Sequence, residues 1–413
     1  MTSKYLAIVA ITALLTACGK SATPIDDSLN LATQARRIAD TNIIVDTHID
    51  VPMLLLKKGG DISIAIEGRD FDYPRAVAGG LNAAFMSIYT DPDLEADGGS
   101  REVAEQLIKL VEDVVKASPD KFAIATSPDD IRRHFAAGLI SLPMGMENGS
   151  PIEGDLANIK HFYDRGIRYI TLAHSLSNHI SDSSYDENRQ WHGLSEFGVE
   201  VVREMNRVGI MVDISHVSDD AFWQVMDIAA VPAIASHSSA RYFTPDFERN
   251  MNDEMIKRLA DNGGVVQINF GSSFVTADAR RYATELGDLG KAYKKEHPDA
   301  SYDEIKAAIA PSYMEKNGPF PYADTADILD HIDHVVALTS IDNVGIGSDY
   351  DGVGDTLPTG LKDVSSYPNL IEGLLERGYL ESDIRKILGE NILRVWSEVE
   401  AFAAQAAMTS SST

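Results

Sequence analysis

The sequence is poor in cysteine, in basic residues and in long apolar runs. Cys18 is the only cysteine among 413 residues, so the chain cannot form an internal disulfide. No stretch reaches the roughly 18 consecutive apolar residues that a transmembrane helix needs. Lysine and arginine number 36 against 63 aspartates and glutamates, which gives a formal net charge of −27. Because such a chain repels a phosphate backbone at long range, we expect no nucleic-acid partner.

A glycine-rich phosphate loop is also missing, since neither G-x-G-x-x-G nor a P-loop follows the first apolar, β-branched segment. Hydrophobic residues nevertheless make up 44% of the chain, enough for a large core in one α/β domain or in two smaller ones. Amphipathic helical patterns separate eight candidate strands, which lie at 42–48, 81–89, 139–148, 167–174, 210–216, 232–238, 263–270 and 343–349. This alternation favours an α/β fold of the (β/α)8 barrel type over a doubly wound sheet. We expect the longest insertion, about residues 271–325, to fold as helices over the barrel mouth.

The N-terminal segment "MTSKYLAIVAITALLTACGK" has the pattern of a secretory signal peptide, with a lysine, an apolar stretch and small residues before Cys18. Within it "LTAC" resembles the bacterial lipobox, in which the cysteine becomes the first mature residue and is lipidated. The alternative is a coincidental cysteine in an ordinary signal sequence. The lipobox and Gly19 predict a protein of the bacterial cell envelope, held by its lipid anchor only and sorted to the outer membrane, facing the periplasm.

These patterns divide the chain into four parts. We expect a signal peptide at 1–17, the lipidated Cys18 with a polar tether at 18–38, a barrel domain at 39–402 and a disordered tail at 403–413.

Polar residues stand where the predicted strands end. Six strands finish in a histidine or an acid, namely His48, Glu147, His174, His216, His237 and Asp349. Barrel enzymes build their sites at that face, and Asp50 points to the same side as His48 because side chains alternate along extended chain. A single histidine at a strand end is commonly structural, but a buried acid with neither partner nor cation would cost several kcal/mol. The cluster therefore predicts a metal site at the C-terminal ends of the strands.

Imidazole and carboxylate ligands suit zinc or another divalent first-row ion, and the lack of thiolates argues against a closed structural zinc site. We therefore expect open coordination positions and catalysis. The ligand count also allows two metals, if one carboxylate bridges, among His48, Asp50, Glu147, His216 and His237. Two ions about 3.5–4 Å apart would share a hydroxide while one polarises the scissile carbonyl. Spacing alone leaves the bridge open.

Other polar residues have simpler interpretations. His331 and His334 lie three apart on a helix before strand eight, where we expect a solvated face. His179 and His192 flank an acidic loop that either touches substrate or forms a polar lid.

Two further aspartates stand beside the predicted ligands. Asp46 shares the strand face of His48 and is expected to orient an imidazole or to anchor the barrel core, without binding metal. Asp351 is expected to serve a turn.

Several motifs together resemble the membrane dipeptidase (renal dipeptidase) family of zinc peptidases: "VDTHIDVP", "GMEN", "YITLAHSLSN", "ASHSSAR", "GIGSDYDGV" and "NILRVW". The similarity runs from about residue 40 to 400. It implies a (β/α)8 barrel with two zinc ions. One ion would be held by His48 and Asp50, the other by His216 and His237, and Glu147 would bridge them.

The resemblance also implies roles for three residues near the metals. His174 would contact substrate and stabilise the tetrahedral oxyanion, and Asp349 would take the proton of the bridging hydroxide and pass it to the leaving amine. An arginine would bind the C-terminal carboxylate of the substrate, and the sequence context favours Arg249 over Arg241.

The activity implied is that of a lipid-anchored zinc dipeptidase that also tolerates a D-residue at the C-terminal position. Homodimers are common in the family. The alternatives are a related amidohydrolase that acts on N-acyl amino acids, lactones or β-lactams, and a peptide-binding lipoprotein with a dead site. The last alternative predicts the loss of a ligand or of Asp349, and none is lost.

Overall fold

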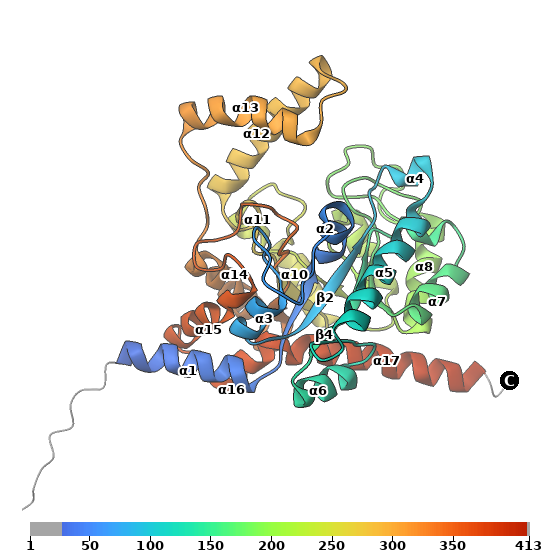
Figure 1. The fold of residues 1–413 in the computed structure, drawn as a ribbon. Coiled ribbons are helices and arrows are strands. Elements are labelled where there is room, and N and C mark those ends of the chain that lie inside the picture. The colour runs from blue at the N-terminus through green and yellow to red at the C-terminus, as the bar shows by residue number, and fades with distance from the viewer. Residues whose placement is uncertain (1–26, 411–413) are drawn as a thin grey trace, which may run out of the picture.

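The computed structural model describes residues 27–410 (Figure 1). The expected signal peptide, Cys18 and the first part of the tether lie outside the described residues. Among residues 27–410, no helix has the length and the hydrophobicity needed to cross a membrane.

Eight parallel strands form a (β/α)8 barrel, and each overlaps one of the predicted ranges. They are β1 (Ile44–Ile49), β2 (Leu81–Tyr89), β5 (Met144–Glu147), β6 (Ile167–Thr171), β7 (Met211–Asp213), β8 (Ile234–Ala235), β9 (Val265–Ile268) and β10 (Val344–Ile346). The ring closes just beyond β10, where Ile49 and Tyr350 form a parallel bridge and the amide of Asp50 donates to the Tyr350 carbonyl at 2.9 Å. Both ends of the domain therefore meet at one seam.

The third predicted strand is broken by Pro143, which has no N–H to donate to a sheet. β4 (Ile140–Leu142) pairs with the first part of β2, and β5 pairs with its second part. The Pro143 carbonyl still accepts the Met86 amide at 2.8 Å, so the break keeps contact with β2. A further short strand, β3 (Phe122–Ile124), pairs with β4 outside the ring and was not predicted.

Helices cover the barrel on the outside (Figure 1). Their bounds are α1 Asp27–Thr41, α2 Val51–Lys58, α3 Tyr73–Gly79, α4 Leu94–Asp97, α5 Ser100–Ala117, α6 Pro128–Ala137, α7 Ala157–Asp164, α8 Glu196–Val208, α9 Asp219–Ile228, α10 Asp253–Asp261, α11 Ser272–Val275, α12 Ala277–Glu296, α13 Tyr302–Asn317, α14 Thr325–Leu338, α15 Tyr367–Glu376, α16 Glu381–Arg385 and α17 Asn391–Ser410. Single turns lie at η1 Ser150–Ile152, η2 Arg241–Phe243, η3 Ile341–Asn343, η4 Val364–Ser366 and η5 Lys386–Glu390.

Helix α8 illustrates how the sequence sets these bounds. The Ser195 hydroxyl caps its start by accepting the Gly198 amide, and Gly209 ends it in the left-handed conformation at φ 99°. Between these caps, Val201, Val202 and Met205 lie on one face of the helix and are buried.

Both expected terminal boundaries are wrong for the described residues. Residues 27–38 belong to helix α1, which packs against α15 and buries Ala35, Ile38 and Ala39 at helical spacing, so the tether does not extend to residue 38. Arg37 also pairs with Glu381. At the other end, residues 403–410 continue α17 as helix, so the tail is not disordered from 403.

The insertion after β9 is helical, as predicted, but only part of it lies at the barrel mouth. Helix α11 lies against the barrel, whereas α12 and α13 rise away from it as an arm (Figure 1). Ser273 and Phe274 of α11, and Lys291 of α12, line the cavity at the strand ends.

Candidate metal centre

The strand ends bring the seven predicted metal ligands and catalytic residues to one place. Each follows or ends a different barrel strand, except that His48 and Asp50 share β1: Glu147 ends β5, His174 follows β6, His216 follows β7, His237 follows β8 and Asp349 follows β10. All except Asp50 and His174 are buried. A cavity of about 680 Å³ opens onto Asp50, Glu147, His174, His216 and Asp349.

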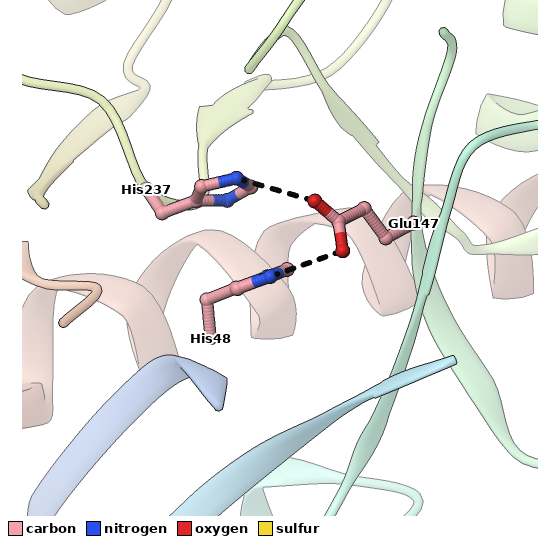
Figure 2. Close-up of side chains that lie close together, drawn as sticks. All are labelled: His48, Glu147 and His237. Carbon is pink, nitrogen blue, oxygen red and sulfur yellow. Dashed lines mark ion pairs between the residues drawn. The ribbon is translucent and has the colours of Figure 1, made fainter. Parts of the chain in front are cut away.

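Glu147 lies at the centre of the cluster, and its two oxygens face different histidines. Oε2 lies 3.3 Å from Nε2 of His48 and accepts the Ser87 hydroxyl at 2.9 Å. Oε1 lies 3.3 Å from Nε2 of His216 and 3.6 Å from Nε2 of His237. Figure 2 shows His48 and His237 reaching one oxygen each. A carboxylate divided in this way has the geometry of a bridge between two sites.

The remaining distances complete two groups around that carboxylate. Nε2 of His48 lies 3.5 Å from Oδ2 of Asp50, and the Nε2 atoms of His216 and His237 lie 2.9 Å apart. Nε2 of His174 also lies 3.3 Å from Oε1 of Glu147.

Three sets of side chains have ligand atoms within 4.8 Å of one another: His48 with Glu147 and His237, Glu147 with His174 and His216, and His48 with Asp50 and Asp349. These sets do not follow the division of ligands between two metal ions that the resemblance implies, because the first set groups His48 with His237. The short His216–His237 and His48–Asp50 distances agree with it.

Hydrogen bonds on the far side of two imidazoles fix their tautomers. The Tyr169 hydroxyl donates to the Thr47 carbonyl at 3.0 Å, so its oxygen accepts Nδ1–H of His48 at 2.9 Å. Nε2 of His48 then faces the cluster and has no hydrogen-bond partner. Ser236 orients His237 in the same way, because its hydroxyl donates to Asp213 at 2.6 Å and lies 2.7 Å from Nδ1. Both Nε2 atoms thus face the cluster, where they can bind a cation.

Two buried aspartates anchor the strands that carry these histidines. Asp46 accepts the amides of His48 and Ser348 at 3.1 and 3.0 Å and the Tyr367 hydroxyl, so it anchors the core, as expected. Asp213 accepts the amides of Ser215 and Ser236 at 3.0 and 2.8 Å.

Sequence reasoning missed Asp213, Ser236 and Tyr169. The signal for Asp213 was available, because "VDISH" has an aspartate before a strand-end histidine as "VDTH" does.

Glycines make room at two points of the centre. A Cβ at Gly145 would lie 1.9 Å from Cζ of Tyr169, so only glycine admits the ring that orients His48. A Cβ at Gly352 would lie 2.2 Å from Oδ2 of Asp50 and 2.3 Å from Oδ1 of Asp349. The glycines of "GMEN" and "SDYDG" are therefore explained by close packing against the site.

The backbone is strained at three positions of the centre. His216 and Asp349 have φ of 70° and 65°, and Asn148, directly after Glu147, has φ of 80°. Non-glycine residues rarely adopt this left-handed region, and such residues cluster at functional sites.

Burial and nearby charges set the protonation of the cluster. Burial lowers the pKa of His216 and of His237 well below the usual histidine range, so both rings are neutral and suited to binding metal. Burial acts to raise the pKa of Glu147, but His48 and His174 outweigh it and hold that pKa well below its usual value.

For Asp349, burial and the charge of Asp50 raise the pKa to about 7. The Asn269 amide donates to Oδ2 of Asp349 at 2.7 Å and fixes the carboxylate.

For His48, burial acts to lower the pKa, but Tyr169, Glu147 and Asp50 raise that pKa well above the usual histidine range. A cation that binds there would displace that proton, and imidazoles with packed carboxylates suit divalent cations.

The two candidate arginines differ in what they contact. Arg241 forms a two-pronged ion pair with Asp219, at 2.7 and 2.5 Å. Arg249 is buried, donates to the Ser238 hydroxyl at 2.6 Å and to the His237 carbonyl at 2.8 Å, and leaves Nε without a partner. The structure thus places Arg249 beside the centre and commits Arg241 to Asp219.

The expectation of a solvated face for His331 is wrong. Its ring is buried, accepting the Ala240 amide at 3.0 Å and contacting the Val275 carbonyl at 2.9 Å, because α14 packs under the loop after β8. His334 is partly buried and pairs with Asp253 at 2.8 Å.

The loop between His179 and His192 reaches the 680 Å³ cavity through Tyr185, whereas its two flanking histidines make other contacts. Nδ1 of His179 contacts Glu95 at 2.8 Å, and His192 is exposed; neither lines the 680 Å³ cavity. Asp351 lies in a turn with φ of 63° and accepts the Asp70 amide at 2.9 Å, as a turn residue would.

A barrel with histidine and carboxylate side chains gathered at its strand ends defines the class of (β/α)8 metalloenzymes. The chain matches the membrane dipeptidase family (peptidase family M19) over residues 32–410, and it belongs to that family. It is a metallo-dipeptidase, and the resemblance seen in the motifs is confirmed.

Three relatives illustrate the similarity. An uncharacterized dipeptidase of Schizosaccharomyces pombe is 31% identical over 375 residues, covering 86% of this chain and 81% of that protein. The probable dipeptidase PvdM from Pseudomonas aeruginosa is 26% identical with a TM-score of 0.80, covering 91% of this chain and 100% of that one. A metallo peptidase from Rhodobacter sphaeroides, solved with a phosphinate mimic of L-Ala-D-Ala, shares the fold at 24% identity and a TM-score of 0.71, over 87% of this chain and 100% of that one.

Proposed function

We propose that this metallo-dipeptidase works with two zinc ions, bridged by Glu147, and accepts dipeptides that include a D-residue at the C-terminal position. One observation carries the two-ion proposal: Oε2 of Glu147 faces His48, whereas Oε1 faces His216 and His237. Nε2 of His48 supports it, because a buried polar atom without a hydrogen-bond partner is explained by a bound ion.

The donor set fits the proposed ions. His48 and Asp50 would hold one, His216 and His237 the other. Two bound divalent ions would supply a nucleophile from a shared water at neutral pH and would polarise the scissile carbonyl.

The surrounding side chains orient the substrate and move its protons. His174 is partly exposed to the cavity and can donate Nε2–H to the oxygen on which charge develops. Asp349, held by Asn269, can accept a proton on the nucleophile side and deliver it to the departing amine. Arg249 can bind the free carboxylate of the substrate through the Nε–H that lacks a partner.

The D-residue proposal draws support from the Rhodobacter sphaeroides relative, whose ligand mimics L-Ala-D-Ala. A panel of L-Ala-L-Ala, L-Ala-D-Ala, N-acetyl-alanine and a β-lactam separates dipeptidase activity from that of an amidohydrolase. We expect cleavage of both dipeptides at rates well above the N-acyl compound and the β-lactam.

Metal counting tests the mechanism. Mass spectrometry of the purified protein is expected to find two zinc ions per chain, and turnover is expected to vanish on chelation and return with zinc. Glu147→Gln, which keeps the shape but weakens both halves of the bridge, is expected to bind less than one ion per chain. A fully active metal-free protein would refute the proposal.

The location and assembly are proposed on the sequence alone. We propose that Cys18 is lipidated and holds the enzyme at the outer membrane of a bacterial cell envelope, facing the periplasm, and that two copies associate. Metabolic labelling with a fatty-acid analogue should mark the wild-type chain and not Cys18→Ser. Light scattering of the chain from residue 27 onward gives its mass and so tests the dimer.

A further inference from the structure

Three aromatic rings form one wall beside the metal centre: Tyr185, Phe247 and Phe274, called here the aromatic wall. The rings of Tyr185 and Phe247 lie 6.0 Å apart, and those of Phe247 and Phe274 lie 5.7 Å apart. Tyr185 also lies 6.0 Å from the ring of His216, and both Tyr185 and Phe274 line the 680 Å³ cavity. The wall thus connects a predicted metal ligand to the space where substrate binds.

Two guanidinium groups stack on this wall. Cζ of Arg249 lies 5.6 Å from the Phe274 centroid, and Cζ of Arg280, in the first turn of α12, lies 3.7 Å from the Phe247 centroid. Burial raises the pKa of Tyr185, and the charges of both arginines oppose that rise, so both act on one phenol.

Neither arginine has an anionic partner among the described residues. The neighbouring Arg281, in contrast, pairs with Asp278 at 3.1 Å. In a chain with 63 acids and 36 bases, two unpaired arginines on one wall are unusual. A guanidinium without an anionic partner in the protein is available to the carboxylate of a ligand.

We propose that the two arginines serve two different carboxylates, so that the enzyme prefers dipeptides whose C-terminal residue has an acidic side chain. The inference rests on the proposed function, in which Arg249 receives the main-chain carboxylate. Arg280 lies on the same wall, so it is placed to receive the side-chain carboxylate of that same C-terminal residue. A guanidinium stacked on a ring keeps its edge free for such a carboxylate.

Helix α12 also brings a positive group to the cavity itself, Lys291. Lys291 lies eleven residues, close to three turns, after Arg280, so both occupy one face of the helix. Lys291 lines the 680 Å³ cavity, and its ammonium lies 3.7 Å from Oδ1 of Asp288 on the same helix. On the face between them lies Gly287, where an added Cβ would meet no atom within 4 Å, so nothing covers the helix there.

Selectivity for charge tests the proposal directly. We would measure kcat/KM of the zinc-loaded enzyme for Ala-Glu, Ala-Gln and Ala-Ala, with the C-terminal residue in both configurations. Ala-Gln matches Ala-Glu in shape and lacks only the charge. The wild type is expected to favour Ala-Glu over Ala-Gln by about tenfold or more, the effect of one charge-assisted hydrogen bond.

Three variants separate a role in specificity from a structural one. Arg280→Gln is expected to bring the Ala-Glu to Ala-Gln ratio close to one while Ala-Ala turnover stays near wild type. Arg280→Lys is expected to keep part of the ratio, because the charge remains. Arg281→Gln removes the same charge one residue away, from an arginine already paired with Asp278, and is expected to leave the ratio unchanged. A ratio is insensitive to the fraction of folded enzyme.

Two results would overturn the inference while the proposed function stands: equal rates for Ala-Glu and Ala-Gln in the wild type, or an equal loss for all three dipeptides in Arg280→Gln. The second would mean that Arg280 serves the main-chain carboxylate or the fold. An enzyme that cleaves none of the dipeptides would refute the proposed function, and this inference with it.

Discussion

The hydroxyl of Tyr169 is predicted to control metal affinity through His48. Tyr169 is fully buried, accepts Nδ1–H of His48 and donates to the Thr47 carbonyl. Tyr169→Phe leaves both partners buried and unpaired, which is expected to cost about 1–3 kcal/mol of folding free energy for each. The substitution also leaves the His48 ring free to rotate and to change tautomer. Loss of a hydrogen bond behind a metal-binding histidine typically weakens metal binding by about 10- to 100-fold.

Competition with a chromophoric chelator measures this affinity, and urea unfolding of the metal-free protein measures stability. Tyr350→Phe is the matched control, because the Tyr350 hydroxyl is also buried and donates to the Leu361 carbonyl at 3.2 Å without contacting a predicted ligand. Both variants are expected to lose stability, and only Tyr169→Phe to lose zinc affinity. Unchanged zinc binding in Tyr169→Phe, or the same loss in both variants, would refute the argument that the hydroxyl orients the ligand.

Three further changes have outcomes that follow from single contacts. Asp349→Asn should lower kcat by about 10²- to 10⁴-fold, as expected for a lost acid–base group, while mass spectrometry still finds bound zinc. Gly352→Ala places a methyl 2.2 Å from Oδ2 of Asp50 and 2.3 Å from Oδ1 of Asp349, and should reduce kcat/KM by about 10²-fold. Gly287→Ala, which meets no atom within 4 Å and has no left-handed backbone, should not. Burial lowers the pKa of His331 from 6.5 to about 4, so the unfolded chain binds a proton at a higher pH than the folded chain does. The contribution of the neutral His331 ring to the free energy of unfolding is therefore fully present above pH 6.5 and is lost as the pH drops towards 4. At about 1.4 kcal/mol per pKa unit the loss approaches about 3 kcal/mol, and urea unfolding of metal-free His331→Gln should lack this part of the pH dependence.

The strand pattern and the residues at the strand ends were predictable from the sequence, because both depend on local chemistry. A buried parallel strand requires an apolar, β-branched run, and a polar residue at its end is conspicuous. His48 and His216 could therefore be identified without knowledge of the fold. The same reasoning located the insertion after β9 and expected Asp46 in the core.

Features that depend on packing between distant segments were not predictable. Tyr169 looks like any apolar strand residue until β5 brings Gly145 under its ring. His331 looks exposed on a helix surface until the loop after β8 covers it. The sequence of helix α1 resembles a polar tether because only a narrow stripe of it is apolar. That stripe is buried only because α15 packs against it.

The ligand positions follow from bonds between strands more than from the ligands themselves. Asp46 accepts the amides of His48, in β1, and of Ser348, two residues after β10. These two strands close the barrel, and the two amides lie 300 residues apart in the sequence. Asp213 likewise accepts the amides of Ser215 and Ser236, which directly precede His216 and His237. Each carboxylate therefore fixes two strand ends through backbone amides. Each of these amides belongs to a predicted site residue or to the residue directly before one. The site therefore keeps its geometry even though its residues come from both ends of the domain. The hydrogen bonds of Asp46 that help to close the barrel between β1 and β10 also align His48 with Asp349.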